Sequence, residues 1–366
     1  MGSVQRQAGS TIKQASFYRP ASRSLSTSLR RTLVLKYIRQ QTYNTQYNIK
    51  MTMMSEKTII AVFCYKRAAK LKRSMEALLQ NPECAEMDVV FFCDGPKGEH
   101  DREGVMQTRA YIDTLSGFRN IYKHYREKNL STGPNFKQGI TWLCDNYDRF
   151  IVVEDDLVVT PNYISYLLKG LDFYKEDQSI FCVTGFCFPI DVKEYRYDTI
   201  VHRRFCSYGW ASWSNRVKHV QWDKEELETI MQQPGFVDKL NKEGHDLSRM
   251  VVKQINGTIS TWDIQMQVHV ARHELKVIYP IISKAYNIGF DNESTNTFGI
   301  DYLKTTLDDG TARSFNFCLS TTEIPVLQRQ LRKPYSLPAL ASRKIANTFI
   351  KFSNKIKAAA SAAVTL

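Results

Sequence analysis

Three consecutive acidic residues, Glu154-Asp155-Asp156, follow directly after the apolar run FIVV at 150–153, and Leu157 resumes the apolar pattern. Carboxylates in such a place need partners, because an unpaired buried charge costs free energy. Hard divalent cations bind carboxylate oxygens and fill their remaining positions with water and phosphate oxygens. The triplet therefore predicts a divalent-cation site, and an acidic surface turn is the plain structural alternative.

Two further polar positions follow apolar runs. Asp94 comes after DVVFFC (88–93), and Lys66-Arg67 come shortly after TIIAVFC (58–64). A carboxylate beside a nucleobase accepts an N–H, and an arginine contacts a diphosphate through paired hydrogen bonds. The structural alternatives are a turn at Asp94-Gly95 and a basic residue that opens a helix.

The third candidate group is Thr261-Trp262-Asp263, which precedes a predicted helix at 264–273. Ser260 or Thr261 is suited to cap that helix, and Asp263 in its first turn is favoured by the helix dipole. Trp262 is an ordinary core anchor. From the residues alone, a structural role is the simpler interpretation of this group.

The elements that must position these residues alternate between strand and helix patterns from Lys57 onward. Apolar runs predict strands at 58–64, 88–93, 149–153 and 180–184, and a short strand is expected at 120–125. Helical spacing predicts helices at 69–80, 101–116 and 134–146, and one that begins with Pro161 in its first turn. This alternation indicates an α/β fold with a mostly parallel, Rossmann-like sheet flanked by helices, whose ligands bind at the carboxyl ends of the strands.

The alternation fades after about residue 186. Loops rich in aromatic residues and glycine are expected there, such as SYGWASW at 207–213, and amphipathic stretches at 223–241 and 245–255. We expect one domain at 57–310, with a ligand-binding half at 57–185 and a second half at 186–310. Residues 1–54 are predicted to be a basic, disordered extension, and 311–366 a basic C-terminal segment.

The net charge of +13 comes from the two ends of the chain. Residues 1–54 hold nine Lys/Arg and residues 324–366 hold eight, without an acid in either segment, which leaves 33 basic against all 37 acidic residues between them. We therefore expect no nucleic-acid groove in the folded part. In the segment 339–366, Ile345, Phe349, Phe352 and Ile356 have helical spacing with lysines beside them. This pattern fits peripheral contact with a membrane surface and equally a helix packed on its own domain.

Eight cysteines lie mostly in apolar runs without a CxxC motif, which indicates buried free thiols in a reducing compartment. No run of about 18 apolar residues predicts a membrane-spanning helix. We expect a cytoplasmic protein, peripheral on a membrane if the C-terminal helix binds one. The alternative is an organelle-targeted protein, because the acid-free segment 1–54 resembles a mitochondrial presequence.

The ordered set of motifs resembles the GT-A glycosyltransferases, specifically the N-acetylglucosaminyltransferase I family and its bacterial capsule-type relatives. The resemblance covers about residues 57–300. It is carried by VFCYKR (62–67), FFCDGP (91–96), VVEDDLVVTPNYISYL (152–167), YGWASW (208–213), TWD (261–263) and YPIISKAYNIGF (279–290).

The resemblance implies a role for each candidate residue. Arg67 corresponds to an arginine near the nucleotide diphosphate and Asp94 to the aspartate that reads uracil. Glu154 and Asp155 correspond to residues that hold the donor's ribose and sugar, and Asp156 to the single protein ligand of Mn2+ (or Mg2+). Trp262 and Asp263 correspond to a Trp-Asp pair that contacts the donor side and supplies the catalytic base. A family histidine would fall near 133–135, where this chain has Gly-Pro-Asn.

These assignments predict a metal-dependent, inverting transferase of the hexosyl or N-acetylhexosaminyl type. It would move a sugar from a nucleotide-sugar donor, a UDP-sugar by the resemblance, to a hydroxyl of a glycan or glycoconjugate. A sugar-1-phosphate nucleotidylyltransferase is disfavoured because CYKRAAK, after the first strand, contains no glycine. The non-enzymatic alternative is a membrane-associated nucleotide- or glycan-binding protein on the same scaffold.

Overall fold

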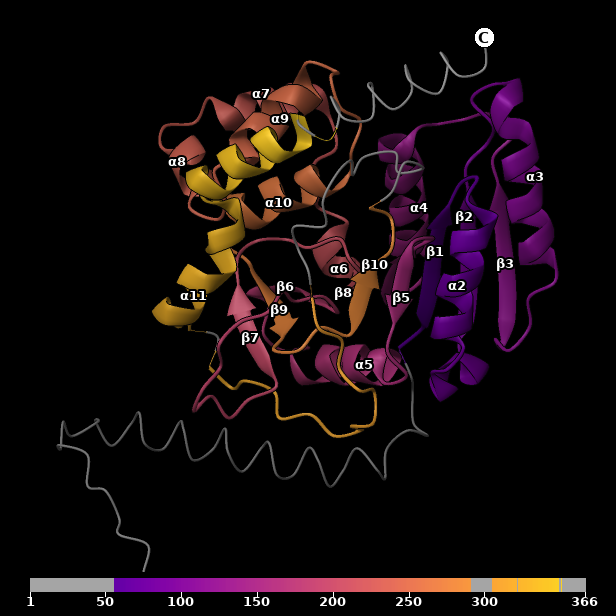
Figure 1. Cartoon of the computed structure of the whole chain (residues 1–366), viewed down its shortest axis with the longest axis horizontal. Helices are drawn as coiled ribbons and strands as arrows, with labels where there is room; N and C mark the ends of the chain where they lie inside the picture. The colour runs from indigo at the N-terminus through magenta and orange to yellow at the C-terminus, as the bar shows by residue number, and fades with distance from the viewer. Residues whose placement is uncertain (1–55, 291–304, 321, 349, 351–366) are drawn as a thin grey trace, which may run out of the picture. The chain divides into compact units, whose positions relative to one another are not determined.

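An eight-stranded mixed sheet organises the chain in a computed structural model, which describes residues 56–290, 305–320, 322–348 and 350 (Figure 1). In sheet order the strands are β3 (Asn120–Tyr125), β2 (Asp88–Cys93), β1 (Thr58–Cys64), β4 (Arg149–Glu154), β8 (Trp210–Trp213), β6 (Ile180–Thr184), β9 (Lys276–Pro280) and β7 (Thr199–His202). The pairs β3–β2, β2–β1, β1–β4 and β6–β9 are parallel, and β8 and β7 run against their neighbours. The predicted mostly parallel α/β sheet is confirmed.

In the first half, β1, β2, β4 and β6 are buried on both faces, as their continuous apolar runs predict, whereas β3 at the edge of the sheet is largely exposed. Along β1, Ile60 and Val62 face one hydrophobic cluster, while Ile59, Ala61 and Phe63 face another. All five side chains are at most 3% exposed. Burial of each isoleucine or valine is worth about 2 kcal/mol relative to exposure, so this strand alone anchors both faces of the sheet.

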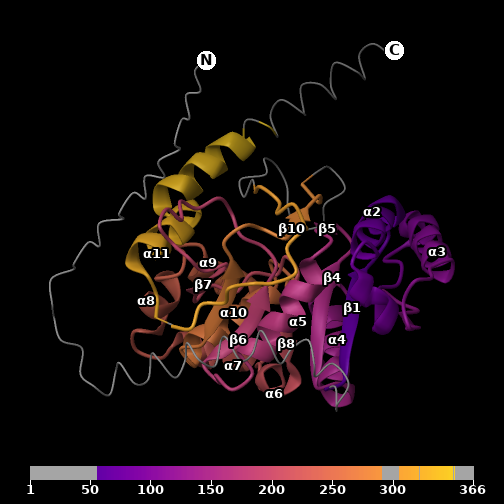
Figure 2. The ribbon, with the colours of Figure 1, turned by 90° about the horizontal axis from the view of Figure 1, so that it is seen from below.

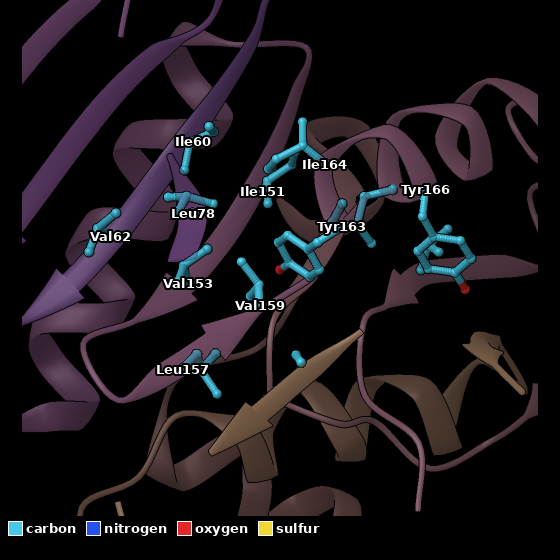
Figure 3. Close-up of a cluster of buried hydrophobic side chains, with 14 of the residues drawn as sticks. Ile60, Val62, Leu78, Ile151, Val153, Leu157, Val159, Tyr163, Ile164 and Tyr166 are labelled. Atoms are coloured by element: carbon cyan, nitrogen blue, oxygen red, sulfur yellow. The ribbon is translucent and has the colours of Figure 1, made fainter. Parts of the chain in front are cut away.

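The first cluster is covered by three helices that follow strands in the chain. These are α2 (Ala68–Leu78), α3 (Glu99–Asp113) and α5 (Tyr163–Phe173). Figure 3 shows Leu78 of α2 and Tyr163 and Ile164 of α5 around Ile60, Ile151 and Val153 of the sheet. The predicted helix at 161 begins at Tyr163, so Pro161 precedes it instead of occupying its first turn.

The opposite face carries α4 (Thr132–Asn146), α10 (Asp263–Arg272) and α11 (Pro325–Arg332). Figure 2 shows the described elements from a second direction. Leu327 and Leu331 of α11 are buried in this second cluster, and Phe315 and Phe317 are buried in the first. Residues beyond 310 therefore contribute to the core. The described residues all fall within one compact unit.

In the second half, one predicted loop is a strand of the central sheet. Residues 210–213 of SYGWASW form β8, a fully buried strand inserted antiparallel between β4 and β6. A short α6 (Ser214–Val217) follows it. Four residues are too few to show a strand period, and the glycine before Trp210 indicated a loop. Gly209 adopts a φ of +71°, which makes the sharp entry into the strand.

The amphipathic stretches form a small helical layer with its own apolar cluster. It contains α7 (Lys224–Met231), α8 (Phe236–Asn241) and α9 (Leu247–Ile255), which pack with α10. The stretch 223–241 is divided after Met231, and Gly235, with a φ of +74°, directly precedes α8. The remaining elements are η1 (Pro82–Glu86), η2 (Lys333–Tyr335) and a two-stranded ribbon of β5 (Leu157–Val159) with β10 (Ala285–Asn287).

The chain ends lie largely outside the described residues. This holds for the predicted extension 1–54 and for Phe349, Phe352 and Ile356 of the C-terminal stripe. Within the described part, residues 337–348 are helical, and none of the helices there is both long and apolar enough to span a membrane. All eight cysteines are free, and six of them are buried, as their apolar surroundings predict.

Candidate functional site

The acidic triplet and Arg67 meet at the point where the chain reverses its direction of winding. The chain adds β2 and β3 to one edge of β1 and then returns to add β4 to the other edge of β1. β1 and β4 are parallel neighbours, so their carboxyl ends lie together. Such a switch point is where open α/β sheets bind ligands. Glu154 ends β4, and Asp155 and Asp156 form the turn that leads into β5.

Arg67 bridges two of the three carboxylates. It lies at the start of α2, and its Nη2 pairs with Asp155 Oδ1 while its Nη1 lies 2.9 Å from Asp156 Oδ2. Its Nε also donates to Asp155 Oδ2 at 3.4 Å. The Arg67 side chain is 16% exposed, so these ion pairs are shielded from solvent. The predicted diphosphate-binding arginine and the predicted metal ligand are therefore in direct contact.

Like charges crowd this turn. Burial raises the pKa of Glu154 well above its usual range, and the charges of Asp156, Asp155 and Asp263 raise it further. Burial and the Asp155 charge raise the pKa of Asp156 to about 6, against the opposing charges of Arg67 and Lys70. A bound cation would relieve this repulsion.

Lys70 is a residue that the sequence interpretation missed. It is only 7% exposed on α2, and its charge lowers the pKa of Asp156. The available signal was its spacing of three residues from Arg67, which places both cations on one face of the helix. The site therefore combines three carboxylates with two cations.

The ribbon of β5 and β10 holds Asp156 from the other side, which the sequence also did not reveal. Asn287 pairs with Leu157, and its Nδ2 donates to Asp156 Oδ1 at 3.4 Å. The Ile288 N–H donates to the Asp156 carbonyl at 2.8 Å, and the Gly289 N–H to Asn287 Oδ1 at 2.6 Å. The motif YPIISKAYNIGF contained these residues, but nothing in it showed that they return to the acidic turn.

The donor set at this turn suits a hard divalent cation, because the available ligands are carboxylate oxygens and the acids outnumber the cations. Within the described ranges, no three His, Cys, Asp or Glu side chains converge as a ligand cluster. Asp156 stays the predicted single protein ligand of such a cation, whose remaining oxygens would come from substrate and water.

Substitution of Gly289 by alanine should disable this turn. A Cβ at Gly289 would overlap Asp156 Oδ2 and would also crowd Asn287 Oδ1 at 2.8 Å. We expect Gly289→Ala to weaken Mn2+ binding about tenfold or more, since a carboxylate must leave its place. The measurement is Mn2+ titration by electron paramagnetic resonance. Gly98→Ala is the control, because a Cβ there meets only the exposed side chain of His100. Unchanged Mn2+ affinity in Gly289→Ala would contradict the assignment.

Asp263 lies close enough to the triplet for its charge to raise the pKa of Glu154, although 108 residues separate the two in sequence. It is the first residue of α10, is half-buried, and accepts a hydrogen bond from Thr261 Oγ1. Burial raises its own pKa, against the Thr261 hydrogen bond and the charge of Arg204. Its place at the helix start also fits the structural interpretation, so geometry allows both roles.

Trp262 is a core residue that positions Asp263. Its side chain is 3% exposed and stacks on Phe136 of α4 with ring centroids 4.3 Å apart. Phe136 stacks in turn on Phe63 of β1, with ring centroids 3.8 Å apart. Trp210 of β8 stacks on Trp262, with ring centroids 5.9 Å apart. This column of rings fixes the start of α10 relative to the sheet. The predicted donor contact of Trp262 stays a prediction.

Asp94 ends β2 as predicted, but its carboxylate already holds a loop together. Oδ1 accepts the N–H groups of Gly95 and Leu130, each at 2.8 Å, and Oδ2 accepts Asn129 Nδ2 at 3.1 Å. Burial raises the pKa of Asp94, while the hydrogen bonds from the Leu130 and Gly95 N–H groups lower it. The turn interpretation is supported, and recognition of uracil stays a prediction.

Asn135, in the place of the family histidine, is buried at the same end of the sheet. Its Nδ2 donates to the Phe92 carbonyl at 3.4 Å, and its Oδ1 accepts Arg126 Nε at 3.3 Å. Arg126 in turn lies over the Phe92 ring, 6.0 Å from its centroid. Sequence reasoning did not single out Arg126, because it follows a short strand without a recognisable motif.

Comparison with known proteins identifies no family. No protein-family model matches the chain, and no curated protein sequence matches it. Among solved structures, it is similar to the mannosyltransferase PcManGT from Pyrobaculum calidifontis in complex with GDP-Man and Mn2+, with a TM-score of 0.36 and 10% identity. The match covers 66% of this chain and 77% of that one. A likeness of this size shows neither a donor nor a metal for this chain.

Proposed function

We propose that this protein is a divalent-metal-dependent glycosyltransferase that uses a nucleotide-sugar donor. The observation that carries the proposal is the meeting of Arg67 with Asp155 and Asp156 at the switch point of the sheet. Asp263, from the second half of the chain, lies close enough to Glu154 of the same turn for its charge to raise the pKa of that carboxyl. A cation-binding turn and a separate carboxylate are what a substitution at a sugar–phosphate bond requires.

The first half of the site handles the leaving group. Breaking the bond between the sugar and its phosphate leaves a nucleoside diphosphate with growing negative charge. A divalent ion bound at this turn supplies charge stabilisation for that group. Asp156 is the protein ligand in this proposal, and Arg67 contacts the diphosphate through its planar fork. Glu154 and Asp155 orient the ribose and the sugar.

The second half handles the acceptor. The acceptor hydroxyl oxygen attacks the anomeric carbon of the sugar. The bond between that carbon and the diphosphate oxygen breaks, and the hydroxyl proton moves to the Asp263 carboxylate. Attack from the face opposite the leaving group inverts the anomeric centre. The hydrogen bond from Thr261 and the stacked ring of Trp262 keep this carboxylate in place.

The proposal also includes the identity of the donor and the family of the protein. The motifs favour a UDP-sugar and membership in the N-acetylglucosaminyltransferase I family or its capsule-type relatives. A donor screen tests this by measuring release of UDP, GDP or CMP from nucleotide sugars, with Mn2+, with Mg2+ and with chelator. We expect one nucleotide to be released in a metal-dependent manner, faster when glycan acceptors are added. Absence of binding and turnover with every nucleotide sugar would leave the non-enzymatic alternative.

We also propose that the C-terminal helix contacts an anionic membrane on its cytoplasmic side. At 337–348 the exposed positions follow helical spacing, and Leu337 and Ile345 are 57% and 59% exposed with Lys344 beside them. Ile345 therefore does not pack on the described domain. This exposure favours membrane contact over the alternative that the helix packs on its own domain. The segment 324–366 carries basic residues without an acid, which suits anionic lipid.

Replacement of Leu337 and Ile345 together by serine should weaken binding to vesicles containing phosphatidylserine about tenfold, because two apolar side chains no longer enter the interface. Co-sedimentation with these vesicles and with neutral vesicles is the measurement. Met106→Ser, which changes a 63% exposed residue on α3, serves as the matched control. Equal binding of the double variant and the original chain would contradict the contact.

A further inference from the structure

Arg67 and a divalent cation require the same carboxylate. Both oxygens of Asp156 already receive donors, Oδ2 from Arg67 Nη1 at 2.9 Å and Oδ1 from Asn287 Nδ2 at 3.4 Å. Of these two donors, only Arg67 is charged. A cation that approaches Asp156 meets the full positive charge of the guanidinium at contact distance, in surroundings that are largely shielded from water.

The charges explain why the arginine lies there. Glu154, Asp155 and Asp156 place three carboxyl groups within one turn, so they carry at most three negative charges, and Arg67 and Lys70 bring two positive charges from α2. A divalent ion at Asp156 would make the group net positive if Arg67 stayed between the carboxylates. A nucleoside diphosphate removes that excess, and its oxygens match the arginine fork as well as a carboxylate does.

We propose that Arg67 is an internal counter-ion of the acidic turn that is exchanged for the divalent cation and transferred to the diphosphate when the nucleotide binds. The inference rests on the proposed function and concerns the coupling between its two ligands. The arginine opposes the cation when the nucleotide is absent and binds the nucleotide once the cation is present. Cation and nucleotide therefore bind cooperatively, and by linkage each strengthens the other by the same factor.

The exchange is compatible with the anchoring of Arg67. Its backbone begins α2, where its carbonyl accepts the Leu71 N–H at 3.0 Å, so the helix fixes the Cα while the long side chain changes partners. Asp155 keeps a contact to Arg67 through Nε during the transfer, because this carboxylate is paired separately from Asp156. Lys70 remains on the same helix face and offsets part of the carboxylate charge.

The proposal makes two predictions of opposite sign for one substitution. In the full-length protein, Arg67→Ala should tighten binding of Mn2+ alone about fivefold or more, because its competitor is gone. The same change should weaken binding of UDP at saturating Mn2+ about tenfold or more, because the diphosphate loses its fork. The Mn2+ and UDP affinities of Arg67→Lys should lie between those of the original chain and of Arg67→Ala, since lysine retains the charge without the planar fork.

The measurements are titration of free Mn2+ by electron paramagnetic resonance and calorimetric titration of UDP with Mn2+ present, with GDP in its place if the donor screen selects it. Arg73→Ala is the matched control, because it removes one positive charge from an exposed position of the same helix. Thermal unfolding checks each variant. If Arg67→Ala does not fold, Arg67→Lys serves in its place, with the same directions of change in Mn2+ and nucleotide affinity but smaller changes.

Each outcome decides between the proposals. Tighter Mn2+ binding together with weaker nucleotide binding supports the exchange. Weaker or unchanged Mn2+ binding in Arg67→Ala, with an original chain that binds Mn2+ and nucleotide, overturns the exchange and leaves the proposed transferase standing. An original chain that binds neither Mn2+ nor any nucleoside diphosphate overturns both.

Discussion

Replacement of Asp156 by asparagine should lower metal-dependent sugar transfer by about a thousandfold, because a divalent ion at the leaving group is worth several kcal/mol and each 1.36 kcal/mol is about tenfold in rate. Asparagine keeps the shape of the side chain and an oxygen that accepts from Arg67. It removes the negative charge that holds the cation. The effect therefore reports on cation binding more directly than truncation to alanine would.

Nucleoside diphosphate release is the measurement, together with Mn2+ affinity, which should fall in the same variant. Asp145→Asn is the control, since it removes a carboxylate charge from an exposed position of α4. Metal-dependent turnover within tenfold of the original chain would show that Asp156 is not the ligand. A loss in Asp145→Asn of similar size would indicate a general charge effect.

Asp263→Asn should reduce transfer by about a hundred- to ten-thousandfold, the range typical of a lost general base. Nucleotide binding should remain, because Asp263 lies outside the pairing of Arg67 with Asp155 and Asp156. The asparagine oxygen can still accept from Thr261 Oγ1, so the local geometry is kept while the proton acceptor is lost.

Two titrations separate this role from the structural one. Equal affinity of the variant and the original chain for UDP and Mn2+, combined with lost transfer, identifies a base. Lost nucleotide affinity, or a lowered midpoint of thermal unfolding with transfer per folded molecule unchanged, would make Asp263 a helix-start residue only. Thr261→Val provides the comparison, since it removes the hydrogen bond to the carboxylate and leaves the carboxylate itself.

The first half of the domain, residues 57–185, could be predicted closely from the sequence because its signals are local. Except for the short edge strand β3, each strand there is a continuous apolar run, and Glu154 and Asp94 mark the ends of two of them. The parallel order follows from the alternation of strands and helices. These features need no knowledge of distant contacts, so the mostly parallel sheet could be predicted from pattern alone, whereas the pairing of β1 with β4 is seen only in the structure.

The missing parts are contacts between segments far apart in the chain. Asn287 reaches Asp156 across 131 residues, and no period or spacing encodes that approach. β8 is four residues long and lies between two strands that precede it in sequence. The ring of Trp262 was assigned toward the donor by resemblance, whereas its stacking on Phe136 could be seen only in three dimensions.

The ribbon of β5 and β10 has a consequence for the order in which the site is completed during synthesis. The acidic turn and Arg67 are made early and can meet as soon as β1 and β4 pair. Asn287 and the backbone of Ile288 arrive more than 130 residues later, which at about 5–20 residues per second is many seconds of translation. Until then the nascent chain holds its three acids with the arginine and lysine of α2 alone, so the final geometry of Asp156 is set only when the last quarter of the chain emerges.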